Sequence, residues 1–197
     1  MSKVWIRVLA ILCLGCPLAR ALSFGTVVID PGHGGRDGGC VWNGLVEKKL
    51  CLDTAQRLER LLKAKGLRVI MTRRTDVHVE LEDRAATANR NSKAVFVSIH
   101  FNASRDRSIS GMEIFYRSAS GKKLAGNILR RMDQNLKGVN RGLFRGDLSV
   151  LRRTLMPAVL IECGYLSNQT ESKRCGTVAH RQGLAESIAS GILASRS

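Results

Sequence analysis

The chain has 197 residues, of which 24% are charged and 44% are hydrophobic. This length allows one domain, and the apolar content excludes a chain that is disordered throughout. Lysine and arginine number 32 against 16 acidic residues, which gives a formal net charge of +16. Such an excess predicts an anionic partner, namely nucleic acid, acidic lipid or an acidic wall polymer, and says nothing about the fold.

The first 21 residues have the pattern of a secretory signal peptide. Lys3 and Arg7 precede an apolar run over residues 8–14, and Ala19-Arg20-Ala21 supplies small residues at the spacing that a signal peptidase reads. The run is too short to span a bilayer as a stable helix. We therefore expect cleavage after residue 21, rather than an uncleaved anchor or a buried first helix. The exported protein would be periplasmic or wall-associated, with 29 basic and 16 acidic residues and a charge of +13.

Four cysteines remain after this cleavage, and the sequence leaves their state open. An exported protein can form disulfides, and four cysteines allow three pairings. Buried free thiols are an equally good interpretation, because a domain of this size buries enough apolar area without disulfides. No CxxC motif occurs, so a thiolate zinc site is not indicated, and we do not expect lipidation at Cys16 because Cys13 replaces the usual leucine. The four remaining residues are Cys40, Cys51, Cys163 and Cys175.

From residue 22 onward, short apolar runs alternate with segments of helical period. Runs rich in Val or Ile without polar alternation are typical of buried parallel strands, and apolar residues at i, i+3 and i+4 predict helices. In chain order we predict strands at 26–29, 67–71, 94–99 and 158–161, and an outer strand at 112–116. The predicted helices have their apolar positions at 50–62, 81–88, 124–136 and 184–192, and Gly66 terminates the first of them. This order predicts one α/β domain over 22–197, with a mostly parallel, twisted sheet and helices on both faces.

Three of these strands lead into histidine or glutamate residues, whose side chains can bind a metal or transfer a proton. "TVVID" leads to Pro31-Gly32-His33, "AVFVSI" leads to His100, and "PAVLI" leads to Glu162. Sites in open α/β sheets form at the carboxyl ends of the strands, so we expect these side chains to meet at one edge. Glu47, at the start of the first helix, lies at the same edge. Two histidines and a carboxylate form the ligand set of a catalytic zinc ion with an open position.

Position distinguishes the roles of the two glutamates. Glu47 opens a helix after a glycine-rich loop, where the backbone can bend around a metal, so we expect His33, Glu47 and His100 to hold zinc. Glu162 ends a buried strand, where desolvation would raise its pKa towards the working range of a general base. Taken singly, each histidine is more simply a structural residue and Glu47 an ordinary acid at a helix N-terminus. The four together favour the site.

Neighbouring residues have weaker signals. Asn102 either orients a ligand or hydrogen-bonds the substrate, or it is a simple turn residue at the end of the strand, and the two interpretations are equally good. Asp30 and Asp37 flank His33 and are possible partners of a ligating imidazole, although an ordinary loop role is favoured. Cys163 should be buried and face away from Glu162, because successive side chains of a strand point to opposite faces.

Taken together, these blocks resemble a known family. "VVIDPGHGGRDGG", Glu47, "VSIHFNAS" and "PAVLIECGYLSN" are similar, in content and order, to the zinc-dependent N-acetylmuramoyl-L-alanine amidases (amidase type 3) that separate dividing bacterial cells. The likeness covers nearly the whole mature chain, and Arg141-Gly142 ahead of "VLRRTLMPA" belongs to it. The resemblance implies that His33, Glu47 and His100 ligate zinc and that Glu162 is the catalytic acid and base. The expected reaction is cleavage of the amide between N-acetylmuramic acid and L-alanine in peptidoglycan.

Two departures from the family pattern lead to further expectations. Some members insert a regulatory helix after the second histidine that plugs the site, whereas here only residues 104–110 separate "HFNA" from Gly111. We therefore expect an open site. No wall-binding repeat flanks the catalytic part, so attraction of the +13 surface to anionic wall polymers is our hypothesis for attachment.

Two other functions stay open on the sequence alone. A zinc peptidase that cuts within the peptidoglycan stem peptide would use the same metal ligands, and a basic wall-binding protein without activity would explain the charge. Nucleic acid is disfavoured by the signal peptide and by an aromatic content of only 5%. We expect a monomer without a membrane span.

Overall fold

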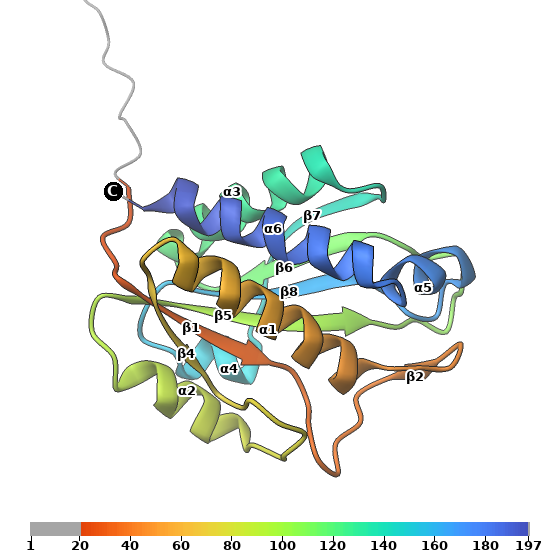
Figure 1. The fold of residues 1–197 in the computed structure, drawn as a ribbon, viewed down its shortest axis with the longest axis horizontal. Helices are drawn as coiled ribbons and strands as arrows, with labels where there is room; N and C mark the ends of the chain where they lie inside the picture. The colour runs from red at the N-terminus through yellow and green to blue at the C-terminus, as the bar shows by residue number, and fades with distance from the viewer. Residues whose placement is uncertain (1–20, 197) are drawn as a thin grey trace, which may run out of the picture.

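The computed structural model describes residues 21–196. The predictions of a signal peptide and of an unlipidated Cys16 concern residues that, apart from Ala21, lie outside this range. Six strands form one twisted sheet in the order β4-β1-β5-β8-β6-β7, and β2 and β3 form a separate small hairpin (Figure 1). The strands are β1 (Thr26–Pro31), β2 (Val41–Trp42), β3 (Leu45–Val46), β4 (Arg68–Met71), β5 (Ala94–Asn102), β6 (Met112–Tyr116), β7 (Asn140–Arg145) and β8 (Ala158–Tyr165).

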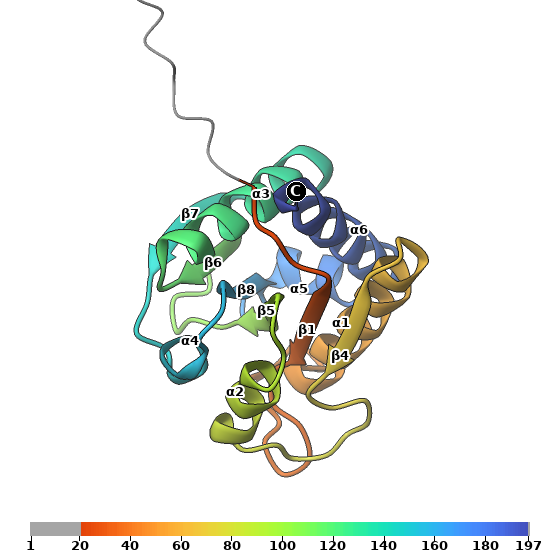
Figure 2. The same ribbon diagram turned by 90° about the vertical axis from the view of Figure 1, so that its left-hand side faces the viewer.

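Helices cover both faces of the sheet unequally. Figure 2 shows the three long helices α1, α3 and α6 on one face and the two short helices α2 and α4 on the other. The helices are α1 (Glu47–Ala64), α2 (Leu81–Asn89), α3 (Ala119–Asn135), α4 (Ser149–Arg153), α5 (Gln169–Cys175) and α6 (Val178–Ser195). Since α2 and α4 are only 9 and 5 residues long, they leave part of their face of the sheet uncovered.

The predicted fold class is confirmed. Strands β4, β1, β5 and β8 run parallel, and β6 pairs antiparallel with β8. Apolar side chains on the α1/α3/α6 face, such as Val27, Val97 and Ile161, join the larger hydrophobic cluster, whereas Phe96 and Leu160 join a smaller cluster under α2 and α4. Burial on both faces is why these strands have no polar alternation.

Three strands, β1, β5 and β8, extend further than the sequence predicted. His100 and Glu162 lie within β5 and β8 rather than beyond them, because the two strands still pair at this point, with His100 opposite Glu162. Glu113 of β6 lies opposite Glu162 on the other side. The three side chains therefore form a row near the carboxyl edge of the parallel strands, on the partly uncovered face.

The cysteines carry no disulfide within the described residues. Cys51, Cys163 and Cys175 are buried and Cys40 is half-buried, and all four are free thiols. Cys163 belongs to the larger cluster, on the face opposite Glu162, as expected. Over residues 21–196, no helix has the length and apolar character needed to cross a membrane.

Candidate metal centre

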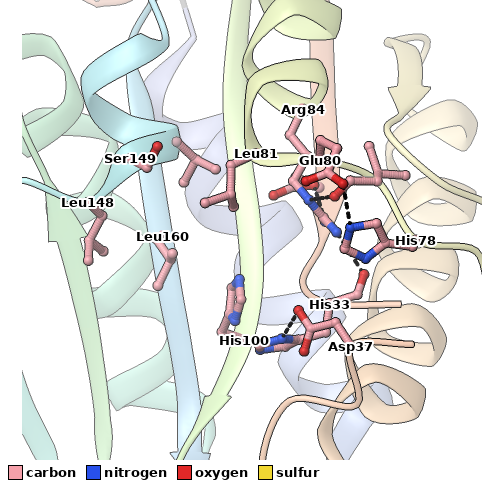
Figure 3. Close-up of a pocket in the computed structure, with 13 residues that line it drawn as sticks. His33, Asp37, His78, Glu80, Leu81, Arg84, His100, Leu148, Ser149 and Leu160 are labelled. Carbon is pink, nitrogen blue, oxygen red and sulfur yellow. Dashed lines mark hydrogen bonds and ion pairs between the residues drawn. The ribbon is translucent and has the colours of Figure 1, made fainter. Parts of the chain in front are cut away.

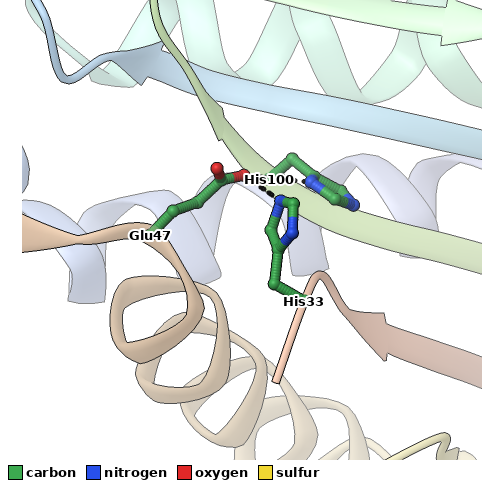
Figure 4. A group of neighbouring side chains, drawn as sticks. All are labelled: His33, Glu47 and His100. Atoms are coloured by element: carbon green, nitrogen blue, oxygen red, sulfur yellow. Dashed lines mark hydrogen bonds and ion pairs between the residues drawn. The ribbon is translucent and has the colours of Figure 1, made fainter. Parts of the chain in front are cut away.

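The three predicted ligands meet at one point of the carboxyl edge. His33 follows β1, Glu47 begins α1, and His100 lies near the end of β5 (Figure 4). Nε2 of His33 and Nδ1 of His100 each lie 3.0 Å from Oε1 of Glu47. One potential ligand atom from each residue lies within 4.8 Å of the other two. Two imidazole nitrogens and a carboxylate oxygen that converge in this way have the composition of a zinc site with an open position.

Backbone donors fix the Glu47 carboxylate in place. The N–H of Phe101 donates to Oε1 at 3.1 Å, and the N–H of Cys40 donates to Oε2 at 2.9 Å. Burial favours the neutral acid, but hydrogen bonds from His100 and His33 outweigh it and hold the pKa of Glu47 well below its usual range. Glu47 is therefore a fixed negative charge, and this environment favours a bound cation.

The second nitrogen of His33 also has a partner. Nδ1 lies 2.8 Å from Oδ2 of Asp37, and this contact fixes which ring nitrogen faces Glu47. Burial opposes protonation of the imidazole, yet Glu47 and Asp37 together raise the pKa of His33. Asp37 therefore orients the ring through Oδ2, and it also has the expected loop role, because its Oδ1 accepts from the N–H of Gly39 at 3.0 Å.

Two buried arginines hold the backbone of the His33 loop. Arg73 donates to the carbonyls of Pro31 and Gly32 at 3.0 and 2.7 Å. Arg84 donates to the carbonyls of Pro31 and His33 at 2.7 and 2.8 Å. We call Arg73 and Arg84 the arginine clamp. The clamp holds His33 in a left-handed conformation, with φ of 59°, that only glycine adopts readily.

Asp30 anchors the arginine clamp from within the sheet. Its carboxylate is fully buried, pairs with Arg84 at 2.8 Å, and accepts hydrogen bonds from the hydroxyls of Thr72 and Ser98. The expected loop role of Asp30 is wrong, because Asp30 lies inside β1. It acts on the His33 backbone through Arg84.

Glycines allow the loop to pass close to the ligands. A Cβ atom on Gly32 would come within 2.3 Å of the His100 ring, and one on Gly39 would come within 2.5 Å of Oε2 of Glu47. Gly39 also has φ of 66°. Any side chain at these two positions would displace a candidate ligand, which explains part of the glycine-rich pattern after β1.

Glu162 is a half-buried residue whose carboxyl group lies beside the three ligands. Its Oε2 atom is buried and has no hydrogen-bond partner among the described residues. Burial raises the pKa of Glu162 to about 7, and the negative charges of Glu47 and Glu113 add to this against the opposing effect of the histidines. An unpartnered buried carboxyl group is costly unless it has another use, and its pKa suits proton transfer near neutral pH.

A cleft of about 410 Å³ opens beside the two histidines. Its walls include Leu81 at the start of α2 and Leu148 just before α4, with Leu160 of β8 between them (Figure 3). His78 and Glu80 also line it. The cleft occupies the part of the sheet face that the short helices leave uncovered.

The structure thus brings all four predicted site residues to one edge. Asn102 also lies there, and its side chain donates to Glu113 at 2.8 Å. Three further residues of the site, Arg73, Arg84 and Glu113, were not predicted from the sequence. Charged residues beside apolar runs, as in "VIMTRR" and "GMEIF", were the available signal, but sequence alone does not distinguish them from solvated charges.

A parallel α/β sheet with a His-Glu-His cluster and a buried carboxyl group at its carboxyl edge is the arrangement of a metal-dependent hydrolase. The family model described as N-acetylmuramoyl-L-alanine amidase (Amidase_3) matches residues 27–194. The chain belongs to this family, which confirms the resemblance and the enzyme class.

Individual relatives agree with this assignment. The N-acetylmuramoyl-L-alanine amidase LytC of Bacillus subtilis is 32% identical over 85% of this chain, and the probable cell wall amidase LytH of Staphylococcus aureus is 35% identical over 85%. The chain spans only 35% and 57% of those two proteins. The solved N-acetylmuramoyl-L-alanine amidase of Clostridium difficile 630 superposes with a TM-score of 0.83 at 37% identity, and the match covers 87% of this chain and 96% of that one.

Proposed function

We propose that the protein is an exported, zinc-dependent amidase that cleaves the bond between the lactyl group of N-acetylmuramic acid and the L-alanine of the stem peptide. The observation that carries this proposal is the convergence of His33 and His100 on one oxygen of Glu47, beside the unpartnered carboxyl group of Glu162. Family membership supports the choice of peptidoglycan as substrate. The signal-like N-terminus and the cell wall relatives support action in the periplasm or at the wall.

His33, Glu47 and His100 would hold the ion. Their donor set fits zinc, because two imidazoles and one carboxylate leave a position open for water or substrate. Bound there, zinc would lower the pKa of a water molecule towards 7 and polarise the scissile carbonyl group. Asp37 keeps the ring of His33 in the orientation in which Nε2 faces Glu47 and would be available to the ion.

Glu162 would move the proton in both halves of the reaction. As the ionised base it takes a proton from the attacking water while the new C–O bond forms. It then gives this proton to the nitrogen of L-alanine as the C–N bond breaks, because an amine leaves poorly without it. The products are the muramic acid carboxylate and a stem peptide with a free L-alanine N-terminus.

Mass analysis of the products from purified muropeptides tests this function. We expect an intact stem peptide that begins with L-alanine. A shortened stem peptide would instead establish a peptidase that cuts within the stem. If protein with a full complement of metal gave no product, the protein would be a wall-binding protein without activity. Metal analysis of the purified protein identifies the ion, and zinc at one equivalent per chain is expected.

Two variants test the assigned roles. Glu162→Gln keeps the size of the side chain but cannot take a proton, so we expect turnover to fall by about 10²–10⁴-fold while bound metal is retained. His33→Ala removes a ligand and should lose metal and activity together. Near-normal hydrolysis by Glu162→Gln would contradict its role as acid and base.

A further inference from the structure

A second charged cluster lies next to the site, on the same face of the sheet. His100, Glu162 and Glu113 occupy neighbouring positions on β5, β8 and β6. Neighbouring strands are about 4.8 Å apart, so Glu113 lies roughly 10 Å from His100. The cluster around Glu113 is therefore within reach of a substrate whose scissile bond is at the metal ligands.

Glu113 is buried and bonded at both oxygens. Oε1 accepts from the Asn102 side chain at 2.8 Å and from the Tyr165 hydroxyl at 3.1 Å. Oε2 accepts from Nε of Arg141 at 2.9 Å. With only 7% of its side chain exposed, this carboxylate is a fixed anchor for the groups around it.

Arg141 is the exposed member of this cluster. It is the second residue of the edge strand β7, and a third of its side chain is exposed. Its guanidinium group lies 5.4 Å from the centre of the Tyr165 ring. The pairing with Glu113 uses Nε, whereas a guanidinium group has five N–H donors in a planar fork. Arg141 is therefore held in one orientation with donors left for a second carboxylate, the partner that such a fork recognises best.

We propose that Arg141 binds the carboxylate that the stem peptide carries on the residue after the scissile alanine, and this assignment rests on the proposed function. Where that residue is D-glutamate joined through its side chain, its α-carboxylate is free. An extended chain advances by at most about 3.6 Å per residue, so this carboxylate lies about 7 Å beyond the scissile bond, in the range of Arg141. Glu113 and Tyr165 act as positioning residues for Arg141.

The test compares two muramoyl tetrapeptides that differ at one group. The second peptide residue is D-glutamate with a free α-carboxylate in one and D-isoglutamine, its α-carboxamide, in the other. We expect the wild-type enzyme to show a KM about tenfold lower for the acid, the size of one charge-assisted hydrogen bond. Arg141→Gln should raise the KM for the acid about tenfold and change the KM for the amide less than twofold, with kcat for both within about twofold.

Two further variants separate recognition from folding. Arg141→Lys keeps the charge without the fork and should give an intermediate KM for the acid. Arg145→Gln removes an exposed arginine of the same strand and should change neither KM. If Arg141→Gln raised both KM values equally, Arg141 would only support Glu113 and the assignment would be wrong, although the amidase function would stand. If the wild-type enzyme cleaved neither substrate, the proposed function would fail as well.

A binding measurement tests the assignment without turnover. Calorimetry with wild-type protein and the two product tetrapeptides, which begin at L-alanine, should show about tenfold tighter binding of the acid. Equal dissociation constants would overturn the role of Arg141 even if the Arg141→Gln variant did not fold.

Discussion

At the scale of single residues, the candidate site depends on atoms that orient the ligands as much as on the ligands themselves. Oε1 of Glu47 accepts a backbone N–H of β5 and faces two imidazole nitrogens. Asp37 then holds the far nitrogen of the His33 ring. A ligand that is free to rotate must lose this freedom when the ion binds, so these outer contacts should contribute to metal affinity.

We predict that Asp37→Ala weakens metal binding by about 10- to 100-fold while the protein stays folded. The loss follows from an imidazole that is no longer held in one orientation. Competition against a fluorescent chelator measures the affinity directly. Asp106→Ala, which removes an exposed carboxylate of the loop between β5 and β6, is the matched control and should leave the affinity unchanged. Equal affinities for wild type and Asp37→Ala would show that Asp37 does not position the ligand.

At the scale of elements, the arginine clamp joins the loop after β1 to its neighbours. Arg84 comes from α2 and Arg73 follows β4, so two elements that neighbour β1 hold this loop. Removing Arg84 would leave Asp30 as an unpaired charge in the core, the costly case for a buried ion pair. We predict that Arg84→Met lowers the free energy of unfolding by about 3–5 kcal/mol in urea titrations.

Arg153 provides the comparison for that experiment. It also forms an ion pair with α2, to Glu82, but both side chains are about half exposed. Arg153→Met should therefore change the free energy of unfolding by at most about 1 kcal/mol. If the two methionine variants lost similar amounts of unfolding free energy, burial of the Asp30–Arg84 pair would not increase its contribution to stability.

A different ion-pair network joins α1 to α6. Asp53 of α1 accepts hydrogen bonds from Arg57 of the same helix and from Arg181 of α6. Burial alone would raise the pKa of Asp53, but these arginines outweigh it and lower the pKa below its ordinary value. Asp53 therefore stabilises the fold when the pH is above its unfolded pKa, about 3.9, and this contribution is lost as the pH falls through the lower folded pKa.

We predict that Asp53→Asn lowers the free energy of unfolding by about 1 kcal/mol at pH 7 and that the difference from wild type disappears in acid. Urea titrations at several pH values between 7 and 2 measure this. Asp133→Asn, an exposed position on α3, should leave the unfolding curve nearly unchanged. A difference from wild type that stays constant down to pH 2 would contradict the assignment to ionised Asp53.

The elements that the sequence predicted are those with a clear hydrophobic pattern. The central strands and the helices α1, α2, α3 and α6 are recognisable because whole faces of them are buried. In contrast, β7 is a half-exposed edge strand of sequence NRGLFR, and α4 has only five residues, so neither has enough buried positions to form a pattern.

The candidate site was predictable for a similar reason, and only in part. His33 follows a strand, Glu47 begins a helix, and His100 and Glu162 lie near the ends of strands. Chain topology alone brings residues at such positions together. The arginine clamp and the partners of Glu113 depend on side chains that reach across several strands. Such contacts follow from three-dimensional packing, which no spacing in the sequence encodes.

At the scale of the whole molecule, the net positive charge predicts how the protein attaches to the cell wall. With a net charge of +13 over residues 22–197, we predict that binding to isolated cell wall sacculi weakens as salt rises from 0.05 to 0.5 M, because the Debye length shrinks over this range. Sedimentation of the Glu162→Gln variant with sacculi measures binding without digestion. Sacculi stripped of anionic polymers should bind less. Binding that is independent of salt would exclude charge as the means of attachment.

The backbone conformation of His33 has a consequence for how the sequence can change. Its left-handed φ of 59° costs a residue other than glycine about 1 kcal/mol. Selection for thermal stability alone would therefore favour glycine at this position. Arg73 and Arg84 would hold the backbone of that glycine equally well, because they bind backbone carbonyls of the loop. Engineering this enzyme for heat resistance by substituting strained positions would thus remove the side chain of a proposed metal ligand, so residue 33 must be kept out of any such library.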